Sequence, residues 1–386
     1  MHWRRWFNQP VMTNYAPTPS IAFPFVGDTV GGSHVSTLLL MRELPRLGFG
    51  AIALVHNDGP LIRYLRSKRI DFIQTKLPYF SAQKSGLAAL ACAGSITPRL
   101  SSFVKRNHIA LIHVNDGRMI ATWAFASRLA ACPIVVHARH RWAPSRLAYI
   151  CFQLAHARIA ISSYVHDSMP KKLAKKTIVL SNPFETTVID RDRARKGIAE
   201  AIGHTRSPVI AFLGTLTEQK RPSIFLRAAA CLSQVIRAQF LVFGRDENVL
   251  CDLKKQTADL GIADFVTFTG FRQDVESLLA GCDLVIAPAV NEGHGRVLVE
   301  AMLHRVPVIA SDSGGHSEII RHRETGLLVT PDDPEAFAKA ALQILNDRPF
   351  RDAIVDMAWS WANLTFSPTH HAEQVAGLYR KLLKIN

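Results

Sequence analysis

The chain has 386 residues, of which 48% are hydrophobic, and it carries a formal net charge of +15. A single hydrophobic core rarely grows beyond ~250–300 residues, so this length predicts two domains. The six cysteines show no C-x-x-C pair and no matching histidine spacing, which argues against a zinc site or a disulfide framework and predicts buried thiols in a reducing compartment.

Short β-branched runs alternate with amphipathic stretches of helical length along the whole chain, a pattern typical of parallel βα units. In the first half we predict strands at 20–25, 50–55, 109–114, 134–137 and 158–161. In the second half we predict strands at 209–213, 239–243, 266–269, 284–287 and 306–310. This rhythm indicates an α/β protein of two doubly wound domains, with the boundary at 180–184, where a strand ends in Ser-Asn-Pro.

Two features of the first half lie beside predicted strands. Gly31 and Gly32 precede a helix that we expect to begin near Ser33; the pair allows either a tight turn or close approach of a ligand. His137 and His140 lie at the end of the 134–137 strand, on the edge that would face a cleft between two such domains. Either histidine could instead be an ordinary core residue.

A loop at 214–221 follows a strand and carries Lys220 just before a helix that opens at Pro222. Proline fits a first helical turn because the missing N–H would have no partner there. A lysine at this mouth can neutralise a diphosphate as a point charge, although a solvent-facing lysine is the alternative.

The segment 291–315, NEGHGRVLVEAMLHRVPVIASDSGG, is the most informative part of the chain. A strand runs into a loop that ends at Gly295, and a helix is predicted from Arg296. The free N–H groups and the positive dipole end of a helix start suit a diphosphate, and Gly293 lets the backbone approach it. Glu300, about one turn into the helix, can accept hydrogen bonds from two vicinal hydroxyls, as on a ribose, while Glu292 faces what lies beyond the phosphates.

This segment, with TGLLVTPDDPEAFAKAA after it, is similar to the donor-site signature of the retaining glycosyltransferases of family four (GT-B fold, glycosyl transferases group 1). Further segments resemble that family in the same order. VGDTVGGSHVSTLLLMREL resembles its amino-terminal glycine loop and first helix, and IAISSYVHD with IVLSNPFE its interdomain segment. FLGTLTEQKRPSIFLRAAA resembles its phosphate-contacting loop, and FSPTHHAEQVAGLYRKLL its closing helix.

The resemblance implies a GT-B fold of two doubly wound, Rossmann-like domains that face a central cleft. Residues 1–184 would bind the acceptor, residues 185–365 would bind the nucleotide-sugar donor, and a helix at 366–386 would pack back on the first domain. The implied activity is transfer of a sugar to an acceptor hydroxyl with retention at the anomeric carbon.

The resemblance also implies roles for individual residues. Glu292 would orient the sugar hydroxyls and Glu300 the ribose, while Lys220 would hold the diphosphate. A histidine of the family contacts the donor sugar, and His137 is the first choice here, with Arg139 and His140 as alternatives. The remaining implied donor contacts are Gly32, Gly293, His294, Gly295, Arg296 and Val297.

Two departures from the family pattern concern charge at the diphosphate. Thr215 stands where the family usually has an arginine, so Arg221, Arg245 or Arg296 could assist Lys220. Asp190 and Asp192 match the D-x-D pattern of metal-dependent glycosyltransferases, but they lie in a charged linker and not at a strand end. We therefore expect no catalytic metal and no cofactor apart from the nucleotide sugar.

The positive charge is concentrated in the first half, which predicts the class of partner. Residues 1–200 hold 27 basic and 10 acidic side chains, a net of +17, whereas residues 201–386 hold 19 and 21, a net of −2. A basic acceptor half favours an anionic glycan, a lipid-linked acceptor or an anionic membrane over nucleic acid, with an ordinary solvated surface as the alternative. The candidate contacts are Trp3, Arg4, Arg5, Trp6, Phe7, Lys171, Lys172, Lys175 and Lys176.

The absence of a long apolar run or a signal-peptide core in this sequence predicts a cytoplasmic protein, at most attached to the inner face of the membrane. Synthesis of cell-envelope polysaccharide or lipopolysaccharide fits that location. A GT-B sugar-nucleotide epimerase or hydrolase, and a non-catalytic nucleotide-sugar binder, are the alternatives. A dinucleotide oxidoreductase is disfavoured because no G-x-G-x-x-G follows a first strand.

Overall fold

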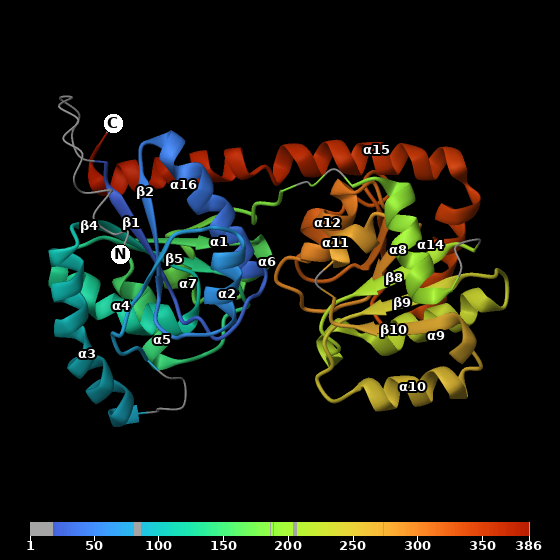
Figure 1. Ribbon diagram of the computed structural model, residues 1–386, viewed down its shortest axis with the longest axis horizontal. Coiled ribbons are helices and arrows are strands. Elements are labelled where there is room, and N and C mark those ends of the chain that lie inside the picture. Colours follow the sequence, from blue (N-terminus) through green and yellow to red (C-terminus); the bar gives the residue numbers. More distant parts are fainter. Residues whose placement is uncertain are drawn as a thin grey trace.

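The computed structural model describes residues 18–80, 86–185, 187, 189–203, 207–272 and 274–385. These residues form two lobes, each built around a parallel sheet (Figure 1). Two consecutive helices, α15 (Arg348–Thr365) and α16 (Pro368–Leu383), run along one side of both lobes and return the chain from the second lobe to the first.

The first sheet has the strand order β3-β2-β1-β4-β5-β6-β7, with every neighbouring pair parallel. The order reverses at β1, between β2 and β4, and such a switch point opens a ligand crevice at the carboxyl ends of the strands. The strands are β1 (Ser20–Phe25), β2 (Gly50–Val55), β3 (Phe72–Gln74), β4 (Ile109–Val114), β5 (Ile134–Ala138), β6 (Ala157–Ala160) and β7 (Thr177–Val179). The helices of this lobe are α1 (Gly32–Glu43), α2 (Pro60–Ser67), α3 (Gly86–Arg106), α4 (Gly117–Ala130), α5 (Arg146–Leu154), α6 (Ser163–Asp167) and α7 (Lys171–Ala174).

The second sheet is also parallel and has the order β10-β9-β8-β11-β12-β13, with its own reversal between β8 and β11. Its strands are β8 (Val209–Leu213), β9 (Gln239–Phe243), β10 (Val266–Gly270), β11 (Leu284–Ala287), β12 (Val308–Ser311) and β13 (Leu327–Val329). Its helices are α8 (Arg191–Ile202), α9 (Pro222–Ser233), α10 (Leu250–Asp259), α11 (Val275–Leu279), α12 (Arg296–Leu303), α13 (His316–Ile319) and α14 (Pro334–Asn346).

Each sheet is buried on both faces, which explains why its strands are apolar runs without strict alternation. In β1, Ile21 and Phe23 pack into one core cluster while Ala22 packs into another. The first of these clusters also contains Val375 and Tyr379 of α16, so the last helix covers one face of the first sheet. The doubly wound, two-domain GT-B arrangement predicted from the sequence is therefore confirmed.

Six predicted strands have the predicted bounds, and four others differ by one or two residues at an end. The short edge strands β3 and β13 were missed, and β7 was expected only as a strand that ends at the domain boundary, because three residues are too few to show a period. Helices α1 and α12 begin at Gly32 and Arg296, within one residue of the starts predicted from the sequence.

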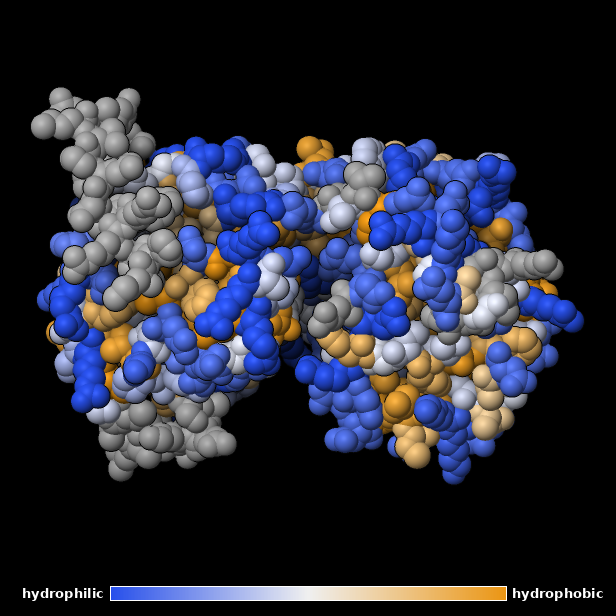
Figure 2. All heavy atoms as spheres, in the orientation of Figure 1, coloured by the Kyte–Doolittle hydropathy of each residue, from blue (hydrophilic) through white to orange (hydrophobic). Residues whose placement is uncertain are grey.

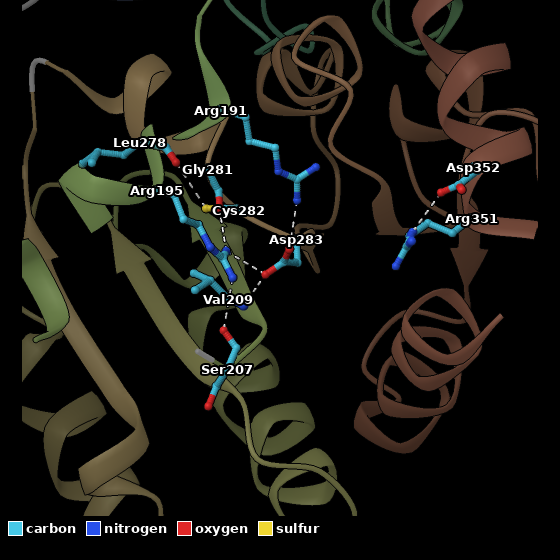
Figure 3. Close-up of polar contacts among 10 residues, drawn as sticks. All are labelled: Arg191, Arg195, Ser207, Val209, Leu278, Gly281, Cys282, Asp283, Arg351 and Asp352. Atoms are coloured by element: carbon cyan, nitrogen blue, oxygen red, sulfur yellow. Dashed lines mark hydrogen bonds and ion pairs between the residues drawn. The ribbon is translucent and has the colours of Figure 1, made fainter. Parts of the chain in front are cut away.

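An acidic residue ties the second sheet to its entry helix (Figure 3). The carboxylate of Asp283, which precedes β11, accepts hydrogen bonds from Arg191 (2.9 Å), Arg195 (2.7 Å) and the backbone N–H of Val209 (2.8 Å). These contacts join α8 to the amino ends of β8 and β11, at the edge of the sheet opposite to the β11–α12 loop.

The cysteines correct one expectation. Cys132, Cys151 and Cys282 are buried as predicted, and burial raises the pKa of each thiol to about 12. Cys251, however, is exposed on the surface of α10, and Cys231 is half-buried. The side chain of Cys92 lies outside the described residues.

Candidate functional site

The loop between β11 and α12 (residues 288–295) leaves the carboxyl edge of the second sheet beside its switch point. The first hydrogen bond of α12 runs from the Leu298 N–H to the Gly295 carbonyl (3.1 Å). The amides of Arg296 and Val297 therefore precede the first closed turn, and such amides lack partners within a helix. The loop and the helix start together present N–H groups and a positive dipole end at this edge.

Lys220 and Glu292 come together at the tip of α12. The Lys220 Nζ lies 2.5 Å from Glu292 Oε2, and the two side chains are 27% and 19% exposed. A 3-10 turn, Glu218–Lys220, positions the lysine, and its Gln219 carbonyl accepts a hydrogen bond from the Val290 N–H (3.0 Å). The predicted cation and the predicted loop carboxylate thus form one partly exposed pair.

Glu300 lies one turn further along α12. Its Oε1 accepts a hydrogen bond from Arg296 Nη2 (2.9 Å), and the side chain is 24% exposed. Burial raises the pKa of the Glu300 carboxyl, although the Arg296 guanidinium acts in the opposite direction. The carboxylate is therefore held in a fixed orientation at low solvent exposure, as a hydroxyl-binding group requires.

Arg296 reaches across to the amino-terminal lobe. Its Nη1 donates hydrogen bonds to Ser36 Oγ (2.8 Å) and to the Gly32 carbonyl (3.4 Å), and its guanidinium lies 4.4 Å from the centre of the Phe184 ring. A Cβ atom at Gly32 would lie only 2.2 Å from Arg296 Cδ. Gly32 therefore leaves room for this arginine, whereas the close approach expected from the sequence was that of a ligand.

Gly314 packs against the backbone of the β11–α12 loop. Gly314 has a φ of +59°, and a Cβ atom there would lie 2.6 Å from the Glu292 carbonyl oxygen. The next residue, Gly315, donates its N–H to that same carbonyl (2.8 Å). The backbone of Glu292 is thus fixed by the loop that follows β12.

His137 does not face the space between the lobes. It is 1% exposed, and its ring lies 5.6 Å from that of His113 and 5.9 Å from that of His371, which belongs to α16. Burial lowers the pKa of His137 well below its ordinary value, so the ring is neutral at pH 7. The side chain is part of the core between the first sheet and α16, and the strand-edge position expected for it belongs to a later residue.

His140 is that residue. It is exposed at the surface, two residues beyond the end of β5. Partial burial of the ring and the nearby Arg139 lower its pKa, and the Glu292 carboxylate is close enough to oppose that lowering. Arg139, the third alternative, is 5% exposed and donates to Asn115 Oδ1 (2.8 Å), Thr37 Oγ1 (3.3 Å) and Asn182 Oδ1. Of the three alternatives, only His140 lies at the surface beside the Lys220–Glu292 pair.

His294 is buried as well, with 4% exposure. Its ring stacks on Phe184 at 5.7 Å and meets the edge of Phe366 at the same distance, and burial lowers its pKa to about 3. Only the backbone of His294 is available to a ligand.

Three arginines were considered as substitutes for the arginine that the family usually has at position 215, and all three contact other groups. Arg296 bonds to Glu300 and Ser36. Arg221 pairs with Asp332 (3.1 Å), and the side chain of Arg245 is 67% exposed and lies 3.5 Å from Glu247. Lys220 is thus left as the cation that meets Glu292.

The D-x-D match has a structural explanation. Asp190 caps α8 by accepting a hydrogen bond from the Arg193 N–H (2.9 Å), and both Asp190 and Asp192 are exposed. Among the described residues, no group of three or more His, Cys, Asp or Glu side chains is placed to bind a metal ion.

Three residues that the sequence reasoning missed join the lobes on the other flank of the loop. Glu318 of α13 accepts hydrogen bonds from the backbone N–H groups of Ser163 and Tyr164, both at 2.7 Å. Ser162 Oγ donates to the Gly293 carbonyl (2.6 Å), and Tyr164 Oη donates to Asn291 Oδ1 (2.8 Å). The Ser-Ser pair after β6 signals a helix start, but no local pattern indicates which acid would reach it.

The space between the lobes is open on one face, where Figure 2 shows a hollow between them. A separate hollow of about 530 Å³ is lined mainly by residues 179–181 and 363–374. None of the predicted site residues lines that second hollow.

The basic residues considered for membrane contact are only partly described. Lys171, Lys172, Lys175 and Lys176 are exposed on and after α7, beside Ile178 and Val179 of the edge strand β7, which are 42% and 43% exposed. The aromatic and basic residues at positions 3–7 lie outside the described residues. Within the part of the chain that the structure describes, no helix combines the length and the apolar character needed to cross a bilayer.

Comparison with known proteins finds similar sequences and structures. Residues 195–361 match the family described as glycosyl transferases group 1. The UDP-Gal:alpha-D-GlcNAc-diphosphoundecaprenol alpha-1,3-galactosyltransferase of Escherichia coli is 23% identical over 82% of this chain and 88% of its own length. The alpha-D-kanosaminyltransferase of Streptomyces kanamyceticus is 29% identical over 50% of this chain, and the match spans only half, 50%, of that relative. Among solved structures, Anabaena Alr3699/HepE in complex with UDP and glucose has 25% identity and a TM-score of 0.78, covering 94% of this chain and 100% of its own.

Proposed function

We propose that the protein transfers a sugar from a nucleotide-diphosphate sugar to an acceptor hydroxyl, because residues 195–361 match the glycosyl transferases group 1 family and the whole chain has the GT-B fold. The observation that carries this proposal is the pairing of Lys220 with Glu292 at 2.5 Å beside the free amides of α12, with Glu300 one turn further. The cation and the helix start fit a diphosphate, Glu292 fits a hexose, and Glu300 fits a ribose. The Anabaena neighbour, which binds UDP and glucose, supports this class of donor.

In the proposed mechanism the protein supplies positioning and electrostatic stabilisation. Lys220 and the α12 amides hold the diphosphate as it leaves, and one of its oxygens accepts the proton of the attacking hydroxyl on the same face of the sugar. This geometry gives retention at the anomeric carbon without a protein nucleophile. Glu292 orients the sugar hydroxyls and stabilises positive charge on the ring, and His140, at its side, takes the donor-sugar contact first assigned to His137.

We propose that the acceptor is an anionic or lipid-linked glycan used in cell-envelope polysaccharide or lipopolysaccharide synthesis. The net charge of +17 in residues 1–200 supports an anionic partner, since such a surface concentrates polyanions and acidic lipid headgroups. The E. coli relative, whose acceptor sugar is carried by diphosphoundecaprenol, supports a lipid-linked one. The protein would then act on the cytoplasmic face of the membrane, with peripheral attachment through the lysines of α7.

The proposal is tested by a thermal-shift screen of nucleotide sugars, followed by a transfer assay with the best donor and a panel of glycan and lipid-linked acceptors. Glu292→Gln should lower kcat roughly 100-fold, as expected for loss of a preorganised charge, and should change the donor Kd far less. The same assay in a metal chelator should proceed at the parent rate, because no step uses a divalent cation.

Other outcomes identify the alternatives. Release of free or inverted sugar nucleotide without an acceptor would mean an epimerase or hydrolase, and donor binding without turnover would mean a non-catalytic binder. Equal turnover of Glu292→Gln and the parent would remove the role assigned to Glu292. Activity lost in chelator and restored by magnesium would contradict metal independence.

A further inference from the structure

The β11–α12 loop is fastened to the amino-terminal lobe on both flanks, by Arg296 on one side and Glu318 on the other. We infer that these two residues are positioning residues, which hold the loop and Glu300 in the form that binds the nucleotide sugar only while the lobes are together. This inference rests on the proposed function. It concerns side chains that need not touch the donor themselves.

Arg296 links the proposed ribose anchor to the other lobe. One guanidinium nitrogen donates to Glu300 Oε1 (2.9 Å), and the other donates to Ser36 Oγ (2.8 Å) and the Gly32 carbonyl (3.4 Å) at the start of α1. The guanidinium is planar and its donors are fixed in a fork, so it cannot keep both sets of contacts if α1 moves away. The orientation of Glu300 therefore depends on the position of the amino-terminal lobe.

Glu318 holds the opposite flank through a charge-assisted contact. Its two carboxylate oxygens accept one hydrogen bond each, at 2.7 Å, from the Ser163 and Tyr164 amides at the start of α6. Those amides would otherwise lack partners, and a carboxylate is the stronger acceptor for them. Glu318 is exposed, so water can replace both contacts when the lobes separate.

The Glu318 contact is connected to the catalytic carboxylate through a short path. Glu318 lies in α13, which begins one residue after Gly315, and the Gly315 N–H donates to the Glu292 carbonyl (2.8 Å). The Ser162 hydroxyl, next to the amides that Glu318 accepts from, donates to the Gly293 carbonyl (2.6 Å). Separation of α6 from α13 thus removes the bond to Gly293 and releases α13, whose preceding residue Gly315 holds Glu292.

The consequence for binding follows from population arithmetic. If the donor binds well only to the closed form, its apparent Kd equals the intrinsic Kd divided by the closed fraction. Loss of one charge-assisted contact worth ~1.4 kcal/mol lowers the ratio of closed to open protein about tenfold. A parent that is about half closed then becomes about one-tenth closed, and donor binding weakens about fivefold. The contacts with the donor itself are unchanged.

The experiment compares full-length variants with matched controls from the carboxyl-terminal lobe. Glu318→Ala is paired with Glu335→Ala, an exposed acid in the first turn of α14. Arg296→Met is paired with Arg305→Met, because Arg305 also meets a carboxylate, Asp356, and an aromatic ring, Trp359 at 4.5 Å, but within one lobe. Kd values for UDP, GDP and the cognate nucleotide sugar are measured by calorimetry, and the radius of gyration by small-angle X-ray scattering.

We expect Glu318→Ala and Arg296→Met to bind the nucleotide sugar about fivefold more weakly than their controls, as the loss of one charge-assisted contact in a half-closed parent requires. Without ligand both should show a larger radius of gyration than the parent, and the donor KM should rise more than kcat falls. Glu318→Gln, which keeps one oxygen for an amide, should recover part of the affinity. Tyr164→Phe, which loses one hydroxyl and keeps its ring, gives a milder change in the same direction.

Variants that match their controls in both affinity and radius of gyration would overturn the inference, and so would an unfolded Glu318→Ala together with a Tyr164→Phe that behaves as the parent. The scattering arm needs no ligand. A parent that binds no nucleotide would therefore refute the proposed function, while an increased radius in the variants would still support the fastening of the loop.

Discussion

At the scale of single residues, the histidines of this protein divide by solvent exposure. His137 and His371 stack on each other inside the amino-terminal lobe, where neutral rings fill volume between the sheet and α16. His140 is exposed and near enough to Glu292 for that carboxylate to affect its pKa, and we propose that it contacts the donor sugar. The two positions are three residues apart, yet they predict different consequences of mutation.

His137→Ala and His140→Ala should separate stability from activity. The first removes a buried ring and a partner of Arg139 Nη2 (3.4 Å), so we expect a loss of about 1–3 kcal/mol in the free energy of unfolding. The second should leave stability within ~0.5 kcal/mol of the parent and lower kcat by roughly tenfold or more. Urea unfolding and a transfer assay below the unfolding transition measure the two effects. If His137→Ala lost activity while keeping full stability, the donor-sugar contact would belong to His137 and not to His140.

Sequence reasoning could predict that Lys220, Glu292 and Glu300 lie near one helix start, because each is placed by its own strand, turn or helix. The signals are local: a helix start after a glycine and an acid one turn later. The contacts of Arg296 with Gly32 and Ser36 were not predictable in that way, since they depend on where the other lobe sits. The burial of His137 depends on α16, which lies more than 200 residues away in the chain.

At the scale of secondary structure elements, the carboxyl and amino edges of the second sheet have different roles. The carboxyl edge of the second sheet carries the β11–α12 loop, and the amino edge carries the Asp283 cluster, which joins α8 to β8 and β11. Central strands could be predicted from their apolar composition, whereas β3 and β13 are too short and too lightly covered to show a pattern. A stabilising cluster at the amino edge should therefore be separable from donor binding.

Asp283→Ala should lower the free energy of unfolding by about 2–3 kcal/mol, because two guanidinium groups and the Val209 amide lose a shared acceptor. The nucleotide-sugar Kd of the folded protein should match the parent value. The matched control is Asp352→Ala, whose exposed pair with Arg351 (3.2 Å) also appears in Figure 3 and is worth only ~0–1 kcal/mol. Chemical denaturation and calorimetry test both variants, and a control that is as destabilised as Asp283→Ala would contradict a special role for the cluster.

At the scale of the whole molecule, buried neutral histidines pack against the two chain segments that connect the lobes. His371 of α16 bonds to the Ser181 carbonyl (2.8 Å), and His294 lies between Phe184 and Phe366, which themselves share a backbone hydrogen bond across the two crossings (2.9 Å). His316 supports the β11–α12 loop from α13. Each of these rings must stay uncharged for the junction to remain packed.

This arrangement predicts the direction of acid unfolding. Burial lowers the pKa of His294 and His371 to about 3 and that of His316 to about 4, against 6.5 for an unperturbed histidine. Below pH 6.5 the unfolded chain therefore binds protons that the folded protein does not, so stability is complete above that pH and is lost as the pH falls towards 4. Each such histidine contributes a slope of up to ~1.4 kcal/mol per pH unit, and Glu300, whose pKa is raised, acts weakly in the opposite direction. Urea midpoints between pH 7.5 and 4.5 should fall steadily, and His371→Gln, which cannot take up a proton, should show a shallower fall than the parent. Midpoints that stay constant across this range would show that these histidines are solvated, and the packing of the junction would then not depend on uncharged rings.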